Sequence, residues 1–216
     1  YLAGVRESFA LLAQMGRGGA PVPARVRVGS PPTFARNLLI PRLPDFYRQC
    51  PDVDVDVVVV APTQDKPERH ELDIRFGVPP FDDRPATPLF ADALVALASP
   101  AFLAAHPLQR PADLADLAEA LLLRCPLLPW QPWFQATGLG RAEPARGASF
   151  SDLGILLEAA ASGLGLALCT RRIAAPWLQN DQLQEILGIA LPSAQTYHLL
   201  LRLDPSFSSA VQVFAD

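Results

Sequence analysis

Several things are scarce in this chain, and each absence excludes a class of protein. It has only three cysteines, Cys50, Cys125 and Cys169, which are widely spaced and form no CxxC pair. Neither a disulfide framework nor a zinc site is therefore indicated, and we expect all three to be small core residues. No apolar run reaches the roughly 18 residues of a membrane span, and no basic segment followed by an apolar one marks a secretory signal. We expect a cytoplasmic protein with no membrane partner.

An excess of positive charge is also missing. The 18 Lys and Arg residues face 22 Asp and Glu residues, which gives a formal net charge of −4. A protein that grips a phosphate backbone is usually basic over one face. We therefore do not expect this segment to bind nucleic acid by itself.

Catalytic motifs are absent as well. The sequence contains no GxSxG, HExxH, P-loop or GxGxxG motif, and its three histidines are far apart. The glycine-rich stretch 162–168 lies between a predicted helix and a strand, the reverse of the order that cradles a phosphate. Asp52, Asp54 and Asp56 alternate along a predicted strand, which is typical of a solvated edge. We expect neither an enzyme nor a metal or cofactor site.

What the chain does have is a regular alternation of strand and helix patterns. The expected strands are 25–29, 53–60, 73–77, 89–98, 121–124, 146–150, 165–169 and 197–203. The expected helices are 34–49, 63–71, one starting after Ser99, one starting at Pro111, 151–162, 172–178 and 206–215, with a kink at Pro41 and Pro44. Ser99 and Ser151 are the expected N-caps, and Gly163 the expected helix stop. This order predicts an α/β fold with mostly parallel sheets.

The first 16 residues place apolar side chains on one narrow stripe of a helix, followed by the linker-like stretch GRGGAPVP. Two readings stay open: a connector from a preceding module, or an ordinary helix packed on the globular part. The chain begins with Tyr1 rather than Met, so we expect it to be a fragment of a longer protein.

Polar residues gather where the predicted strands end, which is where open α/β sheets bind ligands. The turn Ser30-Pro31-Pro32-Thr33 precedes a helix start, whose free N–H groups and positive dipole end suit a carboxylate or phosphate. Thr33 is equally explained as a plain N-cap. Further candidates at or near strand ends are Thr63, Asp65, Arg75, Ser149, Ser151 and Asp152.

The ordered set of segments resembles a known family. "VRVGSPPTFARNLLIPRLPDFYRQCPDVDVDV", "LDIRFG", "LVALASPAFL", "HPLQRPADLADL" and "FSDLGILLEAAASGLGLAL" occur in this order. Together they resemble the C-terminal effector-binding domain of LysR-type bacterial transcriptional regulators over about residues 25–216. "PPTFARNLLIPRL", "IRFG" and the pair Trp130 and Trp133 resemble the branch of the glycine-cleavage activator and the β-lactamase inducers.

The resemblance implies two Rossmann-like lobes joined by two crossover strands, as in type 2 periplasmic binding proteins. Lobe I would comprise 25–92 plus 195–216 and lobe II 93–194, with 1–18 as the end of a dimerising linker helix. A DNA-binding winged helix-turn-helix would precede this chain, and the fragment would form a homodimer or tetramer. A small-molecule effector would bind in the cleft between the lobes and control transcription. A solute-binding protein of the same fold is the alternative.

The resemblance also assigns site residues. The family's first ligand loop is matched by Ser30, Pro32 and Thr33, and its second by Thr63 and Asp65. Residues 149–152 would face these loops from lobe II. Tyr197 matches an aromatic hydroxyl that lines the pocket in some members. Asp152 departs from the family, because many relatives carry a small hydroxyl residue there. Arg75 permits an anionic effector, whereas Asp65 and Asp152 permit an amine, so the effector is expected to be amino-acid-like or anionic. Trp130 and Trp133 either stack on a ligand or, as we expect, pack together in lobe II.

Overall fold

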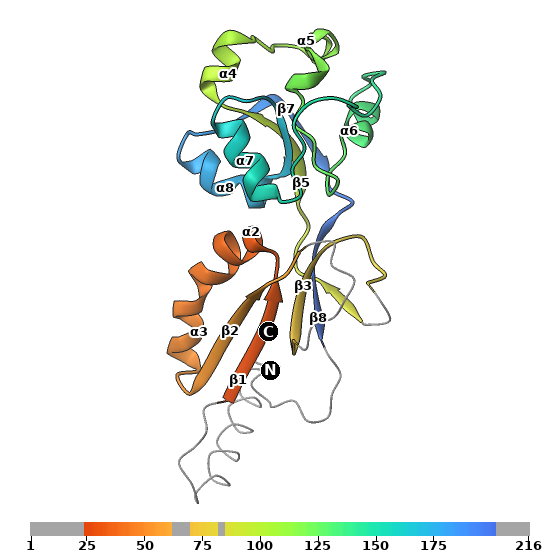
Figure 1. The fold of residues 1–216 in the computed structure, drawn as a ribbon. Coiled ribbons are helices and arrows are strands. Elements are labelled where there is room, and N and C mark those ends of the chain that lie inside the picture. Colours follow the sequence, from red (N-terminus) through yellow and green to blue (C-terminus); the bar gives the residue numbers. More distant parts are fainter. Residues whose placement is uncertain (1–23, 62–69, 82–84, 202–216) are drawn as a thin grey trace, which may run out of the picture.

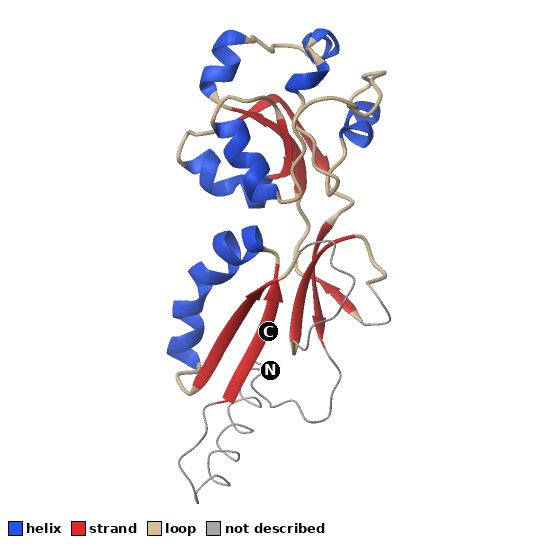
Figure 2. Ribbon diagram, in the orientation of Figure 1, coloured by secondary structure: helices blue, strands red, loops and turns tan. Residues whose placement is uncertain are grey.

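The computed structural model describes residues 24–61, 70–81 and 85–201. In this part of the chain two separate sheets form, one above the other in Figure 1, and Figure 2 shows helices beside each of them. We call the part built on the five-stranded sheet lobe I and the part built on the three-stranded sheet lobe II. The predicted helices 1–16 and 206–215, nearly all of the predicted helix 63–71, and the site candidates Thr63 and Asp65 lie outside the described residues.

Lobe I has the strand order β2-β1-β3-β8-β4. Its strands are β1 (Ala24–Ser30), β2 (Val53–Val59), β3 (Leu72–Gly77), β4 (Ala86–Pro88) and β8 (Thr196–Leu201). Strand β1 pairs in parallel with β2 and β3, whereas β8 runs antiparallel to both β3 and β4. The ends of β1 and β2 therefore lie together at the edge of the sheet that faces lobe II (Figure 1).

One bent helix connects β1 to β2. It consists of α2 (Pro32–Phe34), the π-helical turn η1 (Ala35–Leu39), the 3-10 turn η2 (Ile40–Arg42) and α3 (Leu43–Gln49). A proline ring cannot donate a backbone hydrogen bond and crowds the preceding turn, so Pro41 and Pro44 break the regular α-helical pattern. The predicted kinked helix is confirmed, with the deviation spread over two non-α turns.

Lobe II has the strand order β6-β5-β7, with both pairs antiparallel. Its strands are β5 (Ala93–Ala98), β6 (Ala167–Thr170) and β7 (Gln184–Pro192). Its helices are α4 (Pro100–Ala105), α5 (Pro111–Asp116), the 3-10 turn η3 (Glu119–Leu121), α6 (Trp130–Ala136), α7 (Leu153–Ala161) and α8 (Arg171–Gln179).

The α/β class is confirmed, but the expectation of mostly parallel sheets is wrong. Among the described ladders only β1–β2 and β1–β3 are parallel, and four are antiparallel. The predicted strands 121–124 and 146–150 appear only as isolated parallel bridges, Leu122 to Leu166 and Arg124 to Ser149. Strands β4 and β7 were not anticipated. The direction of pairing depends on which distant strands meet, and local periodicity carries no record of that.

Helix ends agree with the sequence except at one position. The Ser99 side chain accepts a hydrogen bond from the Phe102 N–H at the start of α4, as predicted. Gly163 has a φ of +84° after α7, where a left-handed residue ends the helix. The predicted cap Ser151 is exposed, however, and Asp152 is the N-cap of α7 instead. A carboxylate there serves two backbone donors at once, which one hydroxyl would do less well.

The core of lobe II contains the tryptophan pair. Trp130, Trp133 and Phe134 are fully buried and pack against each other, with 5.9 Å between the two indole centroids. The Trp130 Nε1–H donates to the carbonyl oxygen of Leu123. The expected packing is therefore confirmed.

The chain passes between the two sheets twice. One passage is 89–92, between β4 and β5, and the other is 193–195, between β7 and β8. The lobe boundaries proposed from the sequence, 92/93 and 194/195, remain predictions that fall at these passages.

Candidate functional site at the junction of the lobes

A direct hydrogen bond joins the two lobes at the end of β1. The Thr33 hydroxyl lies 3.0 Å from Oδ1 and 3.1 Å from Oδ2 of Asp152, and it donates to this carboxylate. Thr33 and Asp152 are 119 residues apart in sequence, and their exposed fractions are 1% and 9%. We call this contact, together with the Gly154 N–H described next, the interlobe latch.

The start of α7 completes the latch. The Gly154 N–H points at two acceptors, Thr33 Oγ1 and Asp152 Oδ1, both at 2.9 Å, and the Ile155 N–H donates to Asp152 Oδ1 at 3.0 Å. These donors and the positive end of the helix dipole hold the Asp152 side chain in place at the start of α7. A Cβ on Gly154 would lie 2.4 Å from Thr33 Oγ1, so only glycine permits this approach.

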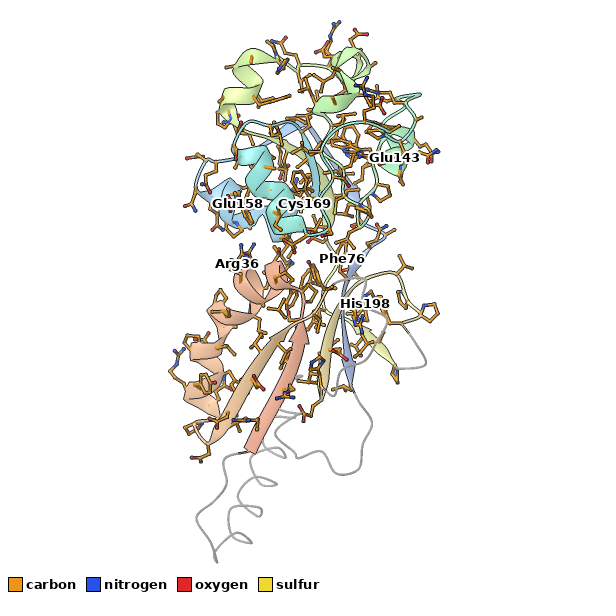
Figure 3. The ribbon with its side chains drawn as sticks, in the orientation of Figure 1. Arg36, Phe76, Glu143, Glu158, Cys169 and His198 are labelled. Atoms are coloured by element: carbon orange, nitrogen blue, oxygen red, sulfur yellow. The ribbon has the colours of Figure 1, made fainter. Side chains whose placement is uncertain are left out.

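A second hydrogen bond reinforces the junction farther along the bent helix. The Asn37 amide in the π-helical turn donates to the carbonyl oxygen of Ile173 in α8 at 3.0 Å. Figure 1 shows the start of the bent helix directly beneath α7 and α8, and Arg36 labelled in Figure 3 lies at this boundary. Neither Asn37 nor Gly154 was singled out from the sequence, because nothing local marks a residue that meets another lobe.

Tyr197 lies behind the latch in an aromatic cluster. Its ring centroid is 4.7 Å from those of Phe34 and Phe76 and 6.1 Å from that of Phe90. Only 2% of Tyr197 is exposed, and this burial raises the pKa of its hydroxyl well above the usual value. The phenol is therefore neutral at physiological pH and able to donate a hydrogen bond.

Two thiols lie on the lobe II side of the same junction. Cys125 and Cys169 are 3% and 0% exposed, and Cys169 is labelled above Phe76 in Figure 3. Burial raises the pKa of both thiols, and the negative charge of Asp152 raises both slightly further. Cys125 and Cys169 are thus buried residues as expected, whereas Cys50 is only half-buried. Reactive cysteines have lowered pKa values, so these thiols have the opposite character.

The remaining residues predicted from the sequence differ in burial. Ser30 is fully buried at the end of β1, where its hydroxyl donates to the carbonyl oxygen of Pro31, and Pro32 is half-buried at the helix start. Ser149 and Ser151 are both exposed. The Thr33 side chain is engaged with a carboxylate and caps no backbone N–H of its own helix, so it is not the N-cap. Binding of an anion by the backbone at this helix start stays a prediction.

Arg75 is directed away from the latch. In the ladder between β3 and β8, Arg75 lies opposite His198, and the next pair is Phe76 opposite Tyr197. Successive residues of a strand point to opposite faces, so Arg75 lies on the other face of the sheet from Tyr197. The structure therefore groups Thr33, Asp152 and Tyr197 but separates Arg75 from them.

Two further features bear on the chemistry of the described part of the chain. It contains no group of three or more His, Cys, Asp or Glu residues able to hold a metal ion. None of its helices combines the length and the apolar character required to cross a membrane.

Comparison with known proteins identifies the architecture. The family model described as the LysR substrate binding domain matches residues 20–216. The chain belongs to this family. The resemblance to LysR-type regulators is thereby confirmed, and the regulator interpretation is supported over the solute-binding alternative.

Individual relatives agree. The glycine cleavage system transcriptional activator of Escherichia coli is 28% identical over 204 residues, which cover 93% of this chain and 66% of that protein. The transcriptional activator AmpR of Pseudomonas aeruginosa is 33% identical over 159 residues, covering 73% of this chain and 52% of AmpR. The LysR-family chain thus spans just under two thirds, or less, of the curated relatives it matches.

Solved structures show the same fold. The effector domain of AmpR from Pseudomonas aeruginosa superimposes with a TM-score of 0.78 at 29% identity, over 89% of this chain and 92% of that one. A full-length variant of the regulator AphB gives a TM-score of 0.69 at 19% identity, covering 98% of this chain and 73% of that one. The two-lobed α/β expectation is confirmed by these matches.

Proposed function

We propose that this domain senses a small molecule between its lobes and controls transcription as part of a LysR-type regulator. DNA would be bound by a winged helix-turn-helix outside this chain, and the domain would act as a homodimer or tetramer in the cytoplasm. Its task would be sensing rather than catalysis. The relatives named as transcriptional activators support this role.

The observation that carries the proposal is the interlobe latch. It joins the lobes through a few polar atoms that are held by a helix start on one side and a strand end on the other. An effector that replaces or bridges these contacts changes the relative stability of two lobe arrangements. A ligand shifts such an equilibrium only if it binds the two arrangements with different affinity.

The latch also constrains the effector. The Asp152 carboxylate already accepts two backbone hydrogen bonds, and a second carboxylate placed beside it would be unfavourable, so an incoming group must be neutral or positive. The neutral Tyr197 hydroxyl can serve as a donor or an acceptor next to it. We therefore propose an effector with an ammonium or amide N–H, such as an amino acid or a peptide-like molecule. Thr33, Asp152 and Tyr197 would contact it, with Ser30 and Pro32 shaping the loop.

A thermal-shift screen of this domain against amino acids, dicarboxylic acids and cell-wall muropeptides tests the proposal. A ligand at about 100 times its Kd stabilises the native state by about 2.7 kcal/mol. For a chain of this size that raises Tm by roughly 5–10 °C. In Thr33→Val, at least ten times more of a hit compound should be needed to produce the same Tm shift. The matched control is Thr87→Val, an exposed threonine on β4, which should leave the shift unchanged. A hit that both variants retain equally would place its site outside the latch and contradict the proposal.

A further inference from the structure

A second binding space lies on lobe I, on the face that the bent helix covers. It is a cavity of about 420 Å³. Its walls come from four parts of lobe I, namely the bent helix, β3, the first passage between the lobes and β8, and from one residue of α8 in lobe II. The lining residues are Phe34, Leu38, Leu39, Arg42, Leu43, Phe46, Ile74, Leu89, Phe90, Arg172 and Leu199. None of the latch residues is among them.

The cavity lining combines a mostly apolar surface with positive charge. Nine of the eleven lining residues are apolar, and the two charged ones, Arg42 and Arg172, are both positive. The Arg172 guanidinium lies 4.4 Å from the ring centroid of Phe90 and is held there by cation–π attraction. The Arg42 guanidinium donates to the carbonyl oxygen of Leu38 at 2.7 Å. The Asp92 carboxylate accepts a hydrogen bond from the Arg172 backbone N–H at 3.2 Å.

Neither guanidinium forms an ion pair with a carboxylate within the described residues. A guanidinium presents several N–H donors in a planar fork, and only one bond of Arg42 to a carbonyl is used here. Two positive groups beside an apolar space match one class of ligand, a molecule with an apolar body and an anionic end. A planar carboxylate fits a guanidinium in particular because it can accept two parallel hydrogen bonds.

The wall of the cavity is also built irregularly. Leu38 and Leu39 belong to the π-helical turn, and Arg42 ends the 3-10 turn that follows it. π-helical turns cost stability relative to a regular helix and are frequent at functional sites. Here the irregular turns carry lining residues close to the point where the bent helix contacts lobe II through Asn37.

We propose that this cavity is a binding site for a small carboxylate with an aromatic or short alkyl body, distinct from the latch. The apolar body lies among the lining side chains, and the carboxylate binds the Arg172 guanidinium with Arg42 beside it. The cavity falls within the size range of small-molecule sites. This inference goes beyond the sensing role proposed above and does not depend on it.

The origin of Arg172 gives such a ligand a regulatory consequence. Ten of the eleven lining residues belong to lobe I or the first passage, whereas Arg172 is on α8 of lobe II. A carboxylate bound to Arg172 with its body in lobe I therefore connects the lobes, and it stabilises the arrangement in which the latch is formed. By linkage, an effector that bridges the latch would tighten binding in the cavity by the same factor as the carboxylate tightens binding at the latch, whereas an effector that replaces the latch contacts would weaken it.

Titration calorimetry with phenylacetate and phenylacetamide tests the proposal. The two probes share a body, but only the acid carries a charge. We expect saturable binding of phenylacetate and binding of the amide at least tenfold weaker. Arg172→Gln should weaken phenylacetate at least tenfold and leave the amide nearly unchanged. Arg171→Gln is the matched control, because this neighbouring guanidinium pairs with Glu185 at 2.6 Å and does not line the cavity.

Leu39→Trp provides a second test, because an indole there fills part of the space. Both probes should lose binding while Tm is retained. Equal affinity for acid and amide, equal effects of the two arginine variants, or no saturable binding at all would overturn the proposal. An absence of saturable binding is also the result expected if a second copy of the chain, or another part of this chain, fills the cavity. A latch effector that still acts on Arg172→Gln and Leu39→Trp would leave the sensing role intact.

Discussion

The two lobes use their aromatic side chains in opposite ways. In lobe II, Trp130, Trp133 and Phe134 come from a single helix, are fully buried and fill the space between them. In lobe I, Phe34 and Phe46 of the bent helix and Phe90 of the first passage line a space that they leave open. The aromatic residues of one helix thus fill the space between them in lobe II, whereas in lobe I part of the aromatic cluster around Tyr197 also borders an open cavity.

The largest expected effect is the loss of stability on truncating an aromatic residue in the lobe II core, and it tests the difference between the two lobes. Trp130→Ala removes a filled volume and a hydrogen bond to Leu123, so it should lower the free energy of unfolding by about 3–5 kcal/mol. Phe46→Ala, at the half-buried edge of the cavity, should cost about 1 kcal/mol. Urea denaturation followed by circular dichroism measures both values. Similar costs for the two substitutions would mean that the lobe I face is packed as tightly as the lobe II core.

A smaller effect should appear where the lobes meet through polar atoms. Gly154→Ala places a methyl group against Thr33 Oγ1 and should destabilise the domain by about 1–3 kcal/mol. In a Thr33→Ala background the same change should cost much less, because the atom it meets is gone. Four denaturation curves make up this double-mutant cycle. Additive costs would show that the latch is not formed in solution.

The latch illustrates what the sequence could and could not reveal. Thr33 and Asp152 were each picked out, because strand ends and helix starts are recognisable locally. Their direct hydrogen bond was not predicted, since it depends on how two lobes meet across 119 residues. Arg75 was included for its charge, but which face of a strand it occupies depends on the register with β8.

The same distinction holds for the fold. The kinked helix, the Ser99 cap and the Gly163 stop follow from neighbouring residues, and these predictions were correct. Strand β7 was missed because its pattern is interrupted by Leu187 and Gly188, both with positive φ. The cavity could not be predicted at all, because its walls come from segments that are far apart in sequence.

The smallest effect concerns the buried thiols. Burial raises the pKa of Cys169 above its ordinary value near 9.0, so the folded state keeps a proton that the unfolded state releases in alkali. The contribution of Cys169 to stability is thus fully present below about pH 9 and is lost as the pH rises, by about 1.4 kcal/mol per pH unit. Denaturation between pH 8 and about pH 10.5 should show this slope.

Substitution separates the two kinds of cysteine. Cys169→Ala should remove its share of the alkaline loss, whereas Cys50→Ala should change the slope less, because Cys50 is only partly buried. Identical slopes in the wild type and in Cys169→Ala would show that another group dominates the loss, Tyr197 being the first to examine.

The two chain passages at 89–92 and 193–195 have a mechanical meaning. A single connection would let two lobes rotate about any axis, whereas two adjacent connections form a hinge. The easy motion that remains is a rigid-body rotation about the line through both connections. The latch is formed by α2 and α7, which lie beside that line in Figure 1 rather than on it. Because the latch lies off this hinge line, a small molecule that alters the latch contacts would act on the rotation of one lobe relative to the other.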